Sequence, residues 1–231
     1  MTATAAKEIQ AWIDGRPREN IIHPHGVTVS LAFWEAIEGL PGAPLTGGPS
    51  RLGKVHIDRG QIFTMADAAV TDSTGTAALK MLWHALAWGS DQRNYNNPGR
   101  IASIAKDPVA AGQLLHKAAK ASRVDPEKAF MLLHPKPGKN AISSLGPNFS
   151  TKFLYFAGAG RVDHPCLIVD KRVMAELHRR TEDSVFLPPG TNYGFFRYEA
   201  ALAQMTAWAR EASTAERMVA PDEVEMWAFR Q

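Results

Sequence analysis

Cysteine is almost absent from this 231-residue chain, since Cys166 is the only one. A single cysteine excludes an internal disulfide, a four-cysteine iron–sulfur cluster and the usual cysteine-rich zinc sites. The eight histidines form no His-Glu-x-x-His motif, and the pair His23 and His25 needs further converging ligands before it can hold a metal. We therefore expect neither a metal nor a cofactor.

Long hydrophobic runs are also missing. No window approaches the roughly 20 apolar residues that a membrane helix needs, and the N-terminal sequence MTATAAKEIQAWIDG lacks the apolar core of a signal peptide. With 45% hydrophobic and 21% charged residues, the chain is long enough to bury a core, as one large domain or as two lobes that share a cleft. We expect a globular, cytoplasmic protein without membrane contact.

The net charge of +3 is small but unevenly distributed. The segment from Arg93 to Lys152 contains ten basic and three acidic residues, which makes it +7 and the remainder −4. A surface of this sign attracts a phosphate backbone, whereas a solvated helical face explains the same charges without any partner. Salt-sensitive binding to DNA distinguishes the two interpretations.

Strand signals are scarce, and helical periodicity dominates the sequence. Asp107-Pro108 and Asp125-Pro126 each combine a capping residue with a first-turn proline, a pattern typical of helix starts. Residues 52–63 alone favour a short hairpin, or a strand and a turn. Apolar spacing and capping signals predict helices at 27–38, 74–88, 108–121, 126–133 and 195–212, and a last one from Pro221. The sequence predicts a mostly α protein.

A helical corner is predicted over residues 139–159. We expect a short helix that ends near Leu145, a tight turn at Gly146-Pro147-Asn148, and a second helix from about Ser150. Glycine and asparagine permit positive φ, and the first N–H groups of the second helix are free to bind an anion. An ordinary helix–turn–helix corner is the alternative. The candidates to grip a phosphate are Gly146, Asn148, Ser150 and Thr151.

Lys152 stands in the first turn of this predicted second helix, among Phe149, Phe153, Tyr155 and Phe156. The positive end of a helix and desolvation by aromatic rings both disfavour the charged ammonium. Neutral amine is what a Schiff-base nucleophile requires. Lys152 is therefore a candidate nucleophile.

Asp170 follows Lys152 by 18 residues. It ends the apolar segment HPCLIVD and precedes the helical pattern KRVMAELHRR, so it is a candidate N-cap, and capping alone is the commoner role of such an aspartate. The combination of a helical hairpin, a lysine on its second helix and an aspartate after one crossing loop favours a functional role instead. We expect Asp170 to be the electrostatic partner of Lys152.

Residues 145–173 resemble the helix-hairpin-helix DNA glycosylases, in which a hairpin is followed by a Gly/Pro-rich loop and an aspartate. Within them the chain is most similar to the 8-oxoguanine glycosylases that use a lysine, especially the bacterial 8-oxoguanine glycosylase-like proteins. The resemblance implies a single helical domain over 1–231, with two helical lobes around a cleft and a helix-hairpin-helix at 139–173. It assigns the catalytic lysine to Lys152 and the catalytic aspartate to Asp170.

The chain departs from the family pattern at several positions. The usual Leu-Pro-Gly-x-Gly hairpin is replaced by LGPNF at 145–149, without the second glycine, and Ile168-Val169 stands where Gly-Pro or Pro-Val is common. Phe156 occupies the position where the animal enzymes place a base-contacting cysteine. Gln204 and Trp208 share a helix face and match a glutamine and an aromatic that hold the extruded base in the family. Core packing of Trp208 beside an exposed Gln204 is the alternative.

The resemblance implies a base-excision repair enzyme that works on damaged DNA as a monomer. Such an enzyme extrudes the damaged nucleotide, excises 8-oxoguanine and cuts the strand as an AP lyase through a lysine Schiff base. Three alternatives stay open on the sequence. They are a glycosylase for a different damaged base, a non-catalytic helix-hairpin-helix DNA-binding protein, and a helical protein without a nucleic acid role.

Overall fold

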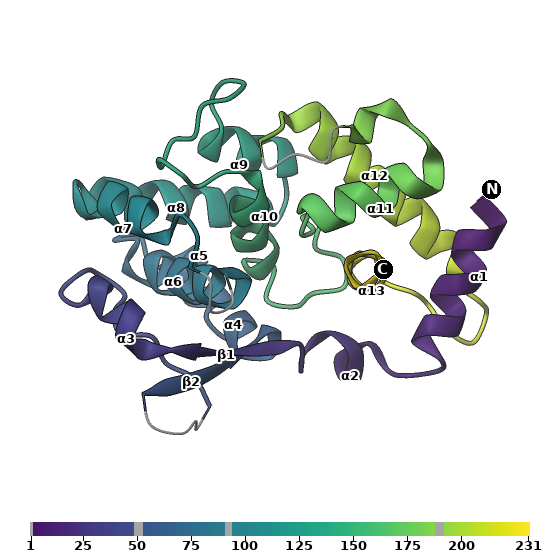
Figure 1. The fold of residues 1–231 in the computed structure, drawn as a ribbon, viewed down its shortest axis with the longest axis horizontal. Coiled ribbons are helices and arrows are strands. Elements are labelled where there is room, and N and C mark those ends of the chain that lie inside the picture. The colour runs from purple at the N-terminus through teal and green to yellow at the C-terminus, as the bar shows by residue number, and fades with distance from the viewer. Residues whose placement is uncertain (1, 49–52, 91–93, 188–191) are drawn as a thin grey trace.

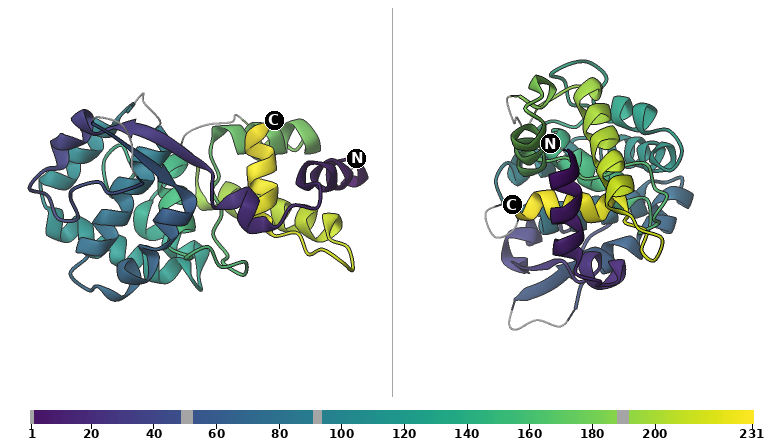
Figure 2. Two further views of the ribbon diagram at one scale, coloured as in Figure 1. Left: turned by 90° about the horizontal axis from the view of Figure 1, so that it is seen from below. Right: turned by 90° about the vertical axis from the view of Figure 1, so that its right-hand side faces the viewer.

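The computed structural model describes residues 2–48, 53–90, 94–187 and 192–231. These residues are mostly helical, and they form two lobes that lie side by side (Figures 1 and 2). No helix in these ranges is long and apolar enough to cross a membrane. The sequence prediction of a mostly α fold is confirmed.

The first lobe holds the small sheet and the central helices. Its elements are β1 (Gly26–Ser30), α3 (Leu31–Trp34), the 3-10 helix η1 (Glu35–Ile37), β2 (Lys54–Asp58), α4 (Arg59–Phe63), α5 (Ala66–Thr71), α6 (Thr76–Ser90), α7 (Asn97–Ala105), α8 (Pro108–Ser122), α9 (Pro126–Leu133) and α10 (Pro147–Phe156). The second lobe combines both ends of the chain. Its elements are α1 (Thr2–Ile13), α2 (Arg18–Ile22), α11 (Lys171–Thr181), the 3-10 helix η3 (Ser184–Phe186), α12 (Phe195–Ala212) and α13 (Pro221–Arg230).

The predicted helix at 27–38 is wrong over its first four residues, which form β1. β1 pairs antiparallel with β2, so that Gly26 lies opposite Asp58 and Ser30 opposite Lys54. The helical part is limited to α3 and η1. In the segment 52–63 the predicted strand is β2, but α4 follows it in place of a turn, and residue 52 lies outside the described residues. Asp58 starts α4 through a capping box with Gln61.

The remaining long helices agree with the sequence predictions. α6 begins and ends two residues later than the predicted 74–88 and is buried over most of its length, with α5, α8 and α10 packed around it. α8 and α9 begin after their predicted caps, since the side chains of Asp107 and Asp125 accept hydrogen bonds from the backbone N–H groups of Ala110 and Lys128. α12 spans the predicted 195–212, and α13 begins at Pro221.

The predicted short helix from Lys139 to Leu145 does not form. This segment consists of turns, closed by a hydrogen bond from Lys139 N to Lys136 O at 3.0 Å, and Ser144 has a φ of 63°. Its backbone groups bond outside the segment, since Ala141 N donates to Leu133 O at 2.9 Å and Ser144 O accepts from Arg100 Nε at 2.8 Å. The helix that precedes α10 is therefore α9, and the two helices pack against each other.

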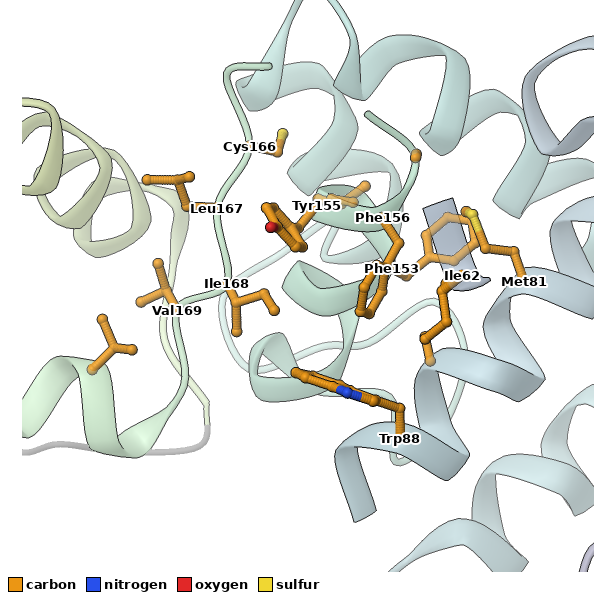
Figure 3. Close-up of a cluster of buried hydrophobic side chains, with 14 of the residues drawn as sticks. Ile62, Met81, Trp88, Phe153, Tyr155, Phe156, Cys166, Leu167, Ile168 and Val169 are labelled. Atoms are coloured by element: carbon orange, nitrogen blue, oxygen red, sulfur yellow. The ribbon is translucent and has the colours of Figure 1, made fainter. Parts of the chain in front are cut away.

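The chain crosses from the first lobe to the second through residues 157–170. The four consecutive residues from Cys166 to Val169 are buried, and they run past Tyr155 in the cluster of Figure 3. Val169 N donates to Thr151 Oγ1 at 3.2 Å, and Tyr198 Oη donates to Leu167 O at 3.0 Å. Both lobes thus bind this segment. These bonds fix the position of Asp170, which lies at the start of the second-lobe helix α11.

Close packing between α6 and α8 depends on Gly75, which has a φ of +82°. An added Cβ there would lie 2.1 Å from Gly112 C, whereas a Cβ at Gly39, with a φ of +80°, would meet no described atom within 4 Å. Both alanine substitutions strain the backbone by about 1–2 kcal/mol. We predict that Gly75→Ala costs a further ~1–3 kcal/mol through overpacking. Urea unfolding of both variants measures the difference, and equal losses would contradict this account.

Candidate active site

Lys152 lies in the second turn of α10, not in the first turn as predicted, because the helix begins three residues earlier at Pro147. Gly146 is the N-cap residue with a φ of −73°, so the turn uses no positive φ at this glycine. Lys152 is only 5% exposed. Its Nζ donates to Asn148 O at 2.9 Å and to Asp170 Oδ2 at 3.1 Å. The structure therefore brings the two predicted site residues into direct contact.

The two carboxylate oxygens of Asp170 have different hydrogen-bond partners. Oδ1 accepts hydrogen bonds from Arg172 N at 3.0 Å and Val173 N at 3.2 Å, which makes Asp170 the N-cap of α11. Oδ2 accepts the bond from Lys152. Burial raises the pKa of the Asp170 carboxyl, but the Lys152 ammonium and the two backbone N–H groups outweigh burial, and the net pKa is lowered. Asp170 is thus an ionised carboxylate held in a fixed direction.

The stem of Lys152 passes over a position of α6 that has no side chain. A Cβ built on Gly89 would lie 2.8 Å from Lys152 Cδ and 3.1 Å from Phe149 Cε1. Real side-chain carbons do not approach so closely, so a larger residue at Gly89 would force the lysine stem to shift. α6 therefore guides the amine toward Asp170.

Lys152 and Asp170 line a cavity of about 460 Å³ between the two lobes. Trp88 and Phe149 line it from the first lobe, and Phe229 and Arg172 line it from the second. The guanidinium carbon of Arg172 lies 5.0 Å from the centroid of the Phe229 ring. The cavity thus combines aromatic side chains with the ion pair of Lys152 and Asp170.

His25, just before β1, also lines this cavity. Its ring stands edge-on to Trp88 at 5.2 Å between centroids, and among the described residues no group hydrogen-bonds to its Nδ1. Burial, reinforced by the nearby Arg59, Arg230 and Lys152 charges, lowers the pKa of His25 to about 3. The imidazole is therefore neutral at physiological pH.

A second cavity of about 460 Å³ lies next to the first, and Asn148 and Phe149 line both. Arg100 is buried there, and its guanidinium carbon lies 3.9 Å from the centroid of the Phe149 ring. Desolvation lowers the pKa of Arg100 to about 10, which still leaves it charged at neutral pH. Gly146 lines this second cavity. Two of the predicted phosphate-binding residues, Gly146 and Asn148, thus face open space.

The other two predicted phosphate-binding residues, Ser150 and Thr151, are completely buried. Ser150 Oγ is hydrogen-bonded to His134 at 2.7 Å, and Thr151 Oγ1 donates to Pro147 O at 2.8 Å and accepts from Val169 N. Their hydroxyls are not accessible to a phosphate in this structure. They hold α10 against its neighbours instead.

The residues predicted to hold a base also lie elsewhere. Phe156, Gln204 and Trp208 are not among the residues that line the cavity with Lys152. Phe156 packs in the core against Trp88, and Trp208 packs inside the second lobe, edge-on to Trp227 at 5.9 Å. Gln204 is half-buried on the same helix as Trp208. The core-packing alternative for Trp208 is the one that the structure shows.

Sequence reasoning did not select the residues that form the cavity walls. Phe149 carried a signal, because it precedes Lys152 by three residues and so shares its helix face. Trp88, His25 and Phe229 carried none, since only the tertiary fold brings these distant positions together. Within the described ranges, no three His, Cys, Asp or Glu side chains gather in a way that could hold a metal ion.

One protein family matches most of the chain. A sequence model of the family described as "Putative 8-oxoguanine DNA glycosylase OGG-like protein" matches residues 20–229. The chain belongs to this family. The resemblance deduced from residues 145–173 is thereby confirmed, and the family places the chain among DNA glycosylase-like proteins of DNA repair. Neither the comparison with curated proteins nor the one with solved structures gave a match.

The lowered pKa of Asp170 predicts a pH-dependent contribution to stability. A carboxyl whose pKa is depressed by folding stabilises the protein above its unfolded pKa, about 3.9, and this contribution is lost as the pH falls through the folded value. Asp170→Asn retains a capping side chain but cannot ionise. We expect wild type to lose more unfolding free energy than Asp170→Asn between pH 7 and pH 3. Urea titrations at several pH values test this, and a constant difference would refute it.

Proposed function

We propose that this protein is a DNA glycosylase and AP lyase that excises 8-oxoguanine from DNA through a Schiff base on Lys152. The observation that carries the proposal is the 3.1 Å contact between Lys152 Nζ and Asp170 Oδ2 in an aromatic-walled cavity between the lobes. A nucleophile beside a fixed carboxylate is an arrangement that can cleave an N-glycosidic bond through an imine. Family membership supports the same reaction class.

The cavity suits an extruded nucleobase. Enzymes that act on a base take it out of the stack and hold it between aromatic or apolar side chains. Trp88, Phe149 and Phe229 are aromatic side chains of this kind beside Lys152, and about 460 Å³ lies within the range of small-molecule sites. Extrusion costs a few kcal/mol, which a damaged base reduces.

Asp170 supports departure of the base through its charge. As the bond between C1′ and N9 lengthens, positive charge develops on the sugar, and an ionised carboxylate nearby stabilises it. The cap bonds from α11 hold the Asp170 carboxylate in place, so it does not have to reorganise during the reaction.

Lys152 supplies the nucleophile. After losing a proton, its amine bonds to C1′ while the bond from C1′ to N9 breaks, and the purine leaves with the bonding electrons and takes up a proton. The attached nitrogen then loses a proton, and its lone pair forms a second bond to C1′ while the bond from C1′ to the ring oxygen breaks. The ring oxygen takes up a proton, which leaves a protonated imine. Loss of a C2′ proton expels the 3′ phosphate and cuts the strand.

The protein binds damaged DNA as a monomer through its charge and through residues at the two cavities. The +7 charge of residues 93–152 supplies attraction for the phosphate backbone that is independent of sequence. Gly146 and Asn148 lie at the cavities and stay candidates for a phosphate contact, with Arg172 on the opposite wall. Affinity for DNA should fall steeply as the salt concentration rises.

Borohydride trapping on a labelled duplex with one 8-oxoguanine tests the nucleophile. We expect wild type to form a lesion-dependent covalent adduct and Lys152→Gln to form none, because glutamine has no amine to make an imine. Lys171→Gln is the matched control, since Lys171 lines the same cavity. At saturating protein this control should still trap.

An adduct that persists in Lys152→Gln would exclude this residue as the nucleophile. If wild type forms no adduct on 8-oxoguanine yet binds DNA in a salt-sensitive way, the same assay on duplexes with other oxidised or alkylated bases separates a different glycosylase from a non-catalytic DNA-binding protein. Absence of any DNA binding would refute the proposal as a whole.

Single-turnover kinetics of Asp170→Asn test the electrostatic role. Removing one preorganised charge or donor of this kind costs about 10²–10³ in rate, so we expect a loss of that size in base release with DNA affinity retained. Thermal melting in parallel shows whether the variant is folded. An unchanged rate in a folded variant would contradict the assignment.

A further inference from the structure

We propose that a buried ion pair between Arg59 and Glu225 is a positioning element that sets the separation of the two cavity walls and thereby controls capture of the base. The inference rests on the proposed function, which it deepens. Both residues are completely buried, and neither lines the cavity. Any effect on the reaction must therefore pass through their neighbours.

The ion pair joins the two lobes. Arg59 is the first residue of α4 in the first lobe, and Glu225 belongs to α13 in the second lobe. Arg59 Nη1 donates to Glu225 Oε2 at 2.8 Å, and Nη2 donates to Oε1 at 3.1 Å. Two parallel bonds between planar groups fix direction as well as distance. The pair thus fixes the orientation of α13 relative to the first lobe.

On the side of the first lobe, Arg59 supports the wall that contains Trp88. Its guanidinium carbon lies 5.1 Å from the centroid of the Trp88 ring, and Trp88 belongs to the cluster in Figure 3. The backbone N–H of Arg59 and the indole N–H of Trp88 both donate to His25 O, at 3.1 and 2.9 Å. Arg59 therefore touches two residues that line the cavity.

In the second lobe, Glu225 positions Phe229. The two residues are four positions apart on α13 and so share one helix face. Phe229 lines the cavity from the second lobe, and its ring lies 5.8 Å from the His25 ring. A shift of Glu225 therefore carries Phe229 with it.

A further buried chain of hydrogen bonds connects the pair to α10. Arg59 Nη1 also donates to Tyr155 Oη at 3.3 Å, and Tyr155 Oη donates to Asp222 Oδ2 at 2.8 Å. Asp222 accepts two bonds from Arg18. Tyr155 follows Lys152 by three residues on the same helix. The network therefore links α13 to α10, the helix that carries the Lys152 amine.

Stability alone does not account for this pair. Burial, together with the nearby Asp170 and Asp222 charges, raises the pKa of Glu225 even though Arg59 is bonded to it and lowers it. Replacing a buried ion pair by apolar residues of similar volume is often neutral or stabilising. What the apolar replacement lacks is the fixed direction of the two hydrogen bonds.

The test compares two reactions of the same protein. Release of 8-oxoguanine needs the base in the cavity, whereas cutting at a preformed abasic site does not. In the double variant Arg59→Met with Glu225→Leu, we expect single-turnover base release to fall about 10- to 100-fold, the loss typical of ångström-scale misplacement. Cutting of abasic DNA should stay within about twofold of wild type. Thermal melting should show a folded protein.

Two further variants complete the comparison. Arg59→Lys keeps the charge but not the paired geometry, so we expect it to lose base release as well, and it replaces the double variant if that one does not fold. Arg180→Met is the matched control, because Arg180 stacks on Trp227 of α13 and pairs with Glu176 inside the second lobe without joining the lobes. This control should retain both reactions.

Equal losses in base release and abasic cutting, or full base release in the folded double variant, would overturn the positioning role. Full activity of Arg59→Lys would show that charge matters and paired geometry does not, which also overturns it. Wild-type protein that releases no base and cuts no abasic DNA would instead refute the proposed function. The two failures are therefore distinct.

Discussion

Burial of the Lys152 ammonium beside the Asp170 carboxylate constrains the whole interface between the lobes. An unpaired charge in a protein interior costs several kcal/mol, so α10 and the first turn of α11 must meet. The crossing segment 157–170 makes this possible, because its buried end is held by Thr151 on one side and Tyr198 on the other. Gly89 completes the arrangement by leaving space for the lysine stem.

A single helix links the chemistry to the packing of the lobes. α10 directs Lys152 into the cavity and Tyr155 into the buried charges three residues later. α13, in the other lobe, likewise directs one residue, Glu225, into the buried interior and another, Phe229, to the cavity wall. Both helices therefore have one part that fixes the interface and another that shapes the site. This division explains how a cavity between two lobes can hold a defined shape.

Local sequence signals predicted elements only where the decisive interactions are local. The helices that begin with Asp-Pro were correct because their caps and first turns are formed by residues a few positions apart. Residues 27–30 were predicted as helix because their apolar spacing fits one, yet they belong to β1 because β2 pairs with them from 24 to 30 positions away. The segment 139–145 has a helical pattern but forms turns, because its backbone groups bond to Leu133 and Arg100 outside the segment.

The sequence by itself determined the helical class and the pairing of Lys152 with Asp170, because the two residues flank one short crossing segment with capping signals of its own. Only the tertiary structure decided which side chains surround that pair. Trp88, His25 and Phe229 reach the cavity from three distant parts of the chain. Helix periodicity places Trp208 on the apolar face of its helix, but it does not show whether that face meets a core or a cavity. That choice depends on how the lobes pack, and buried contacts between distant residues set the packing.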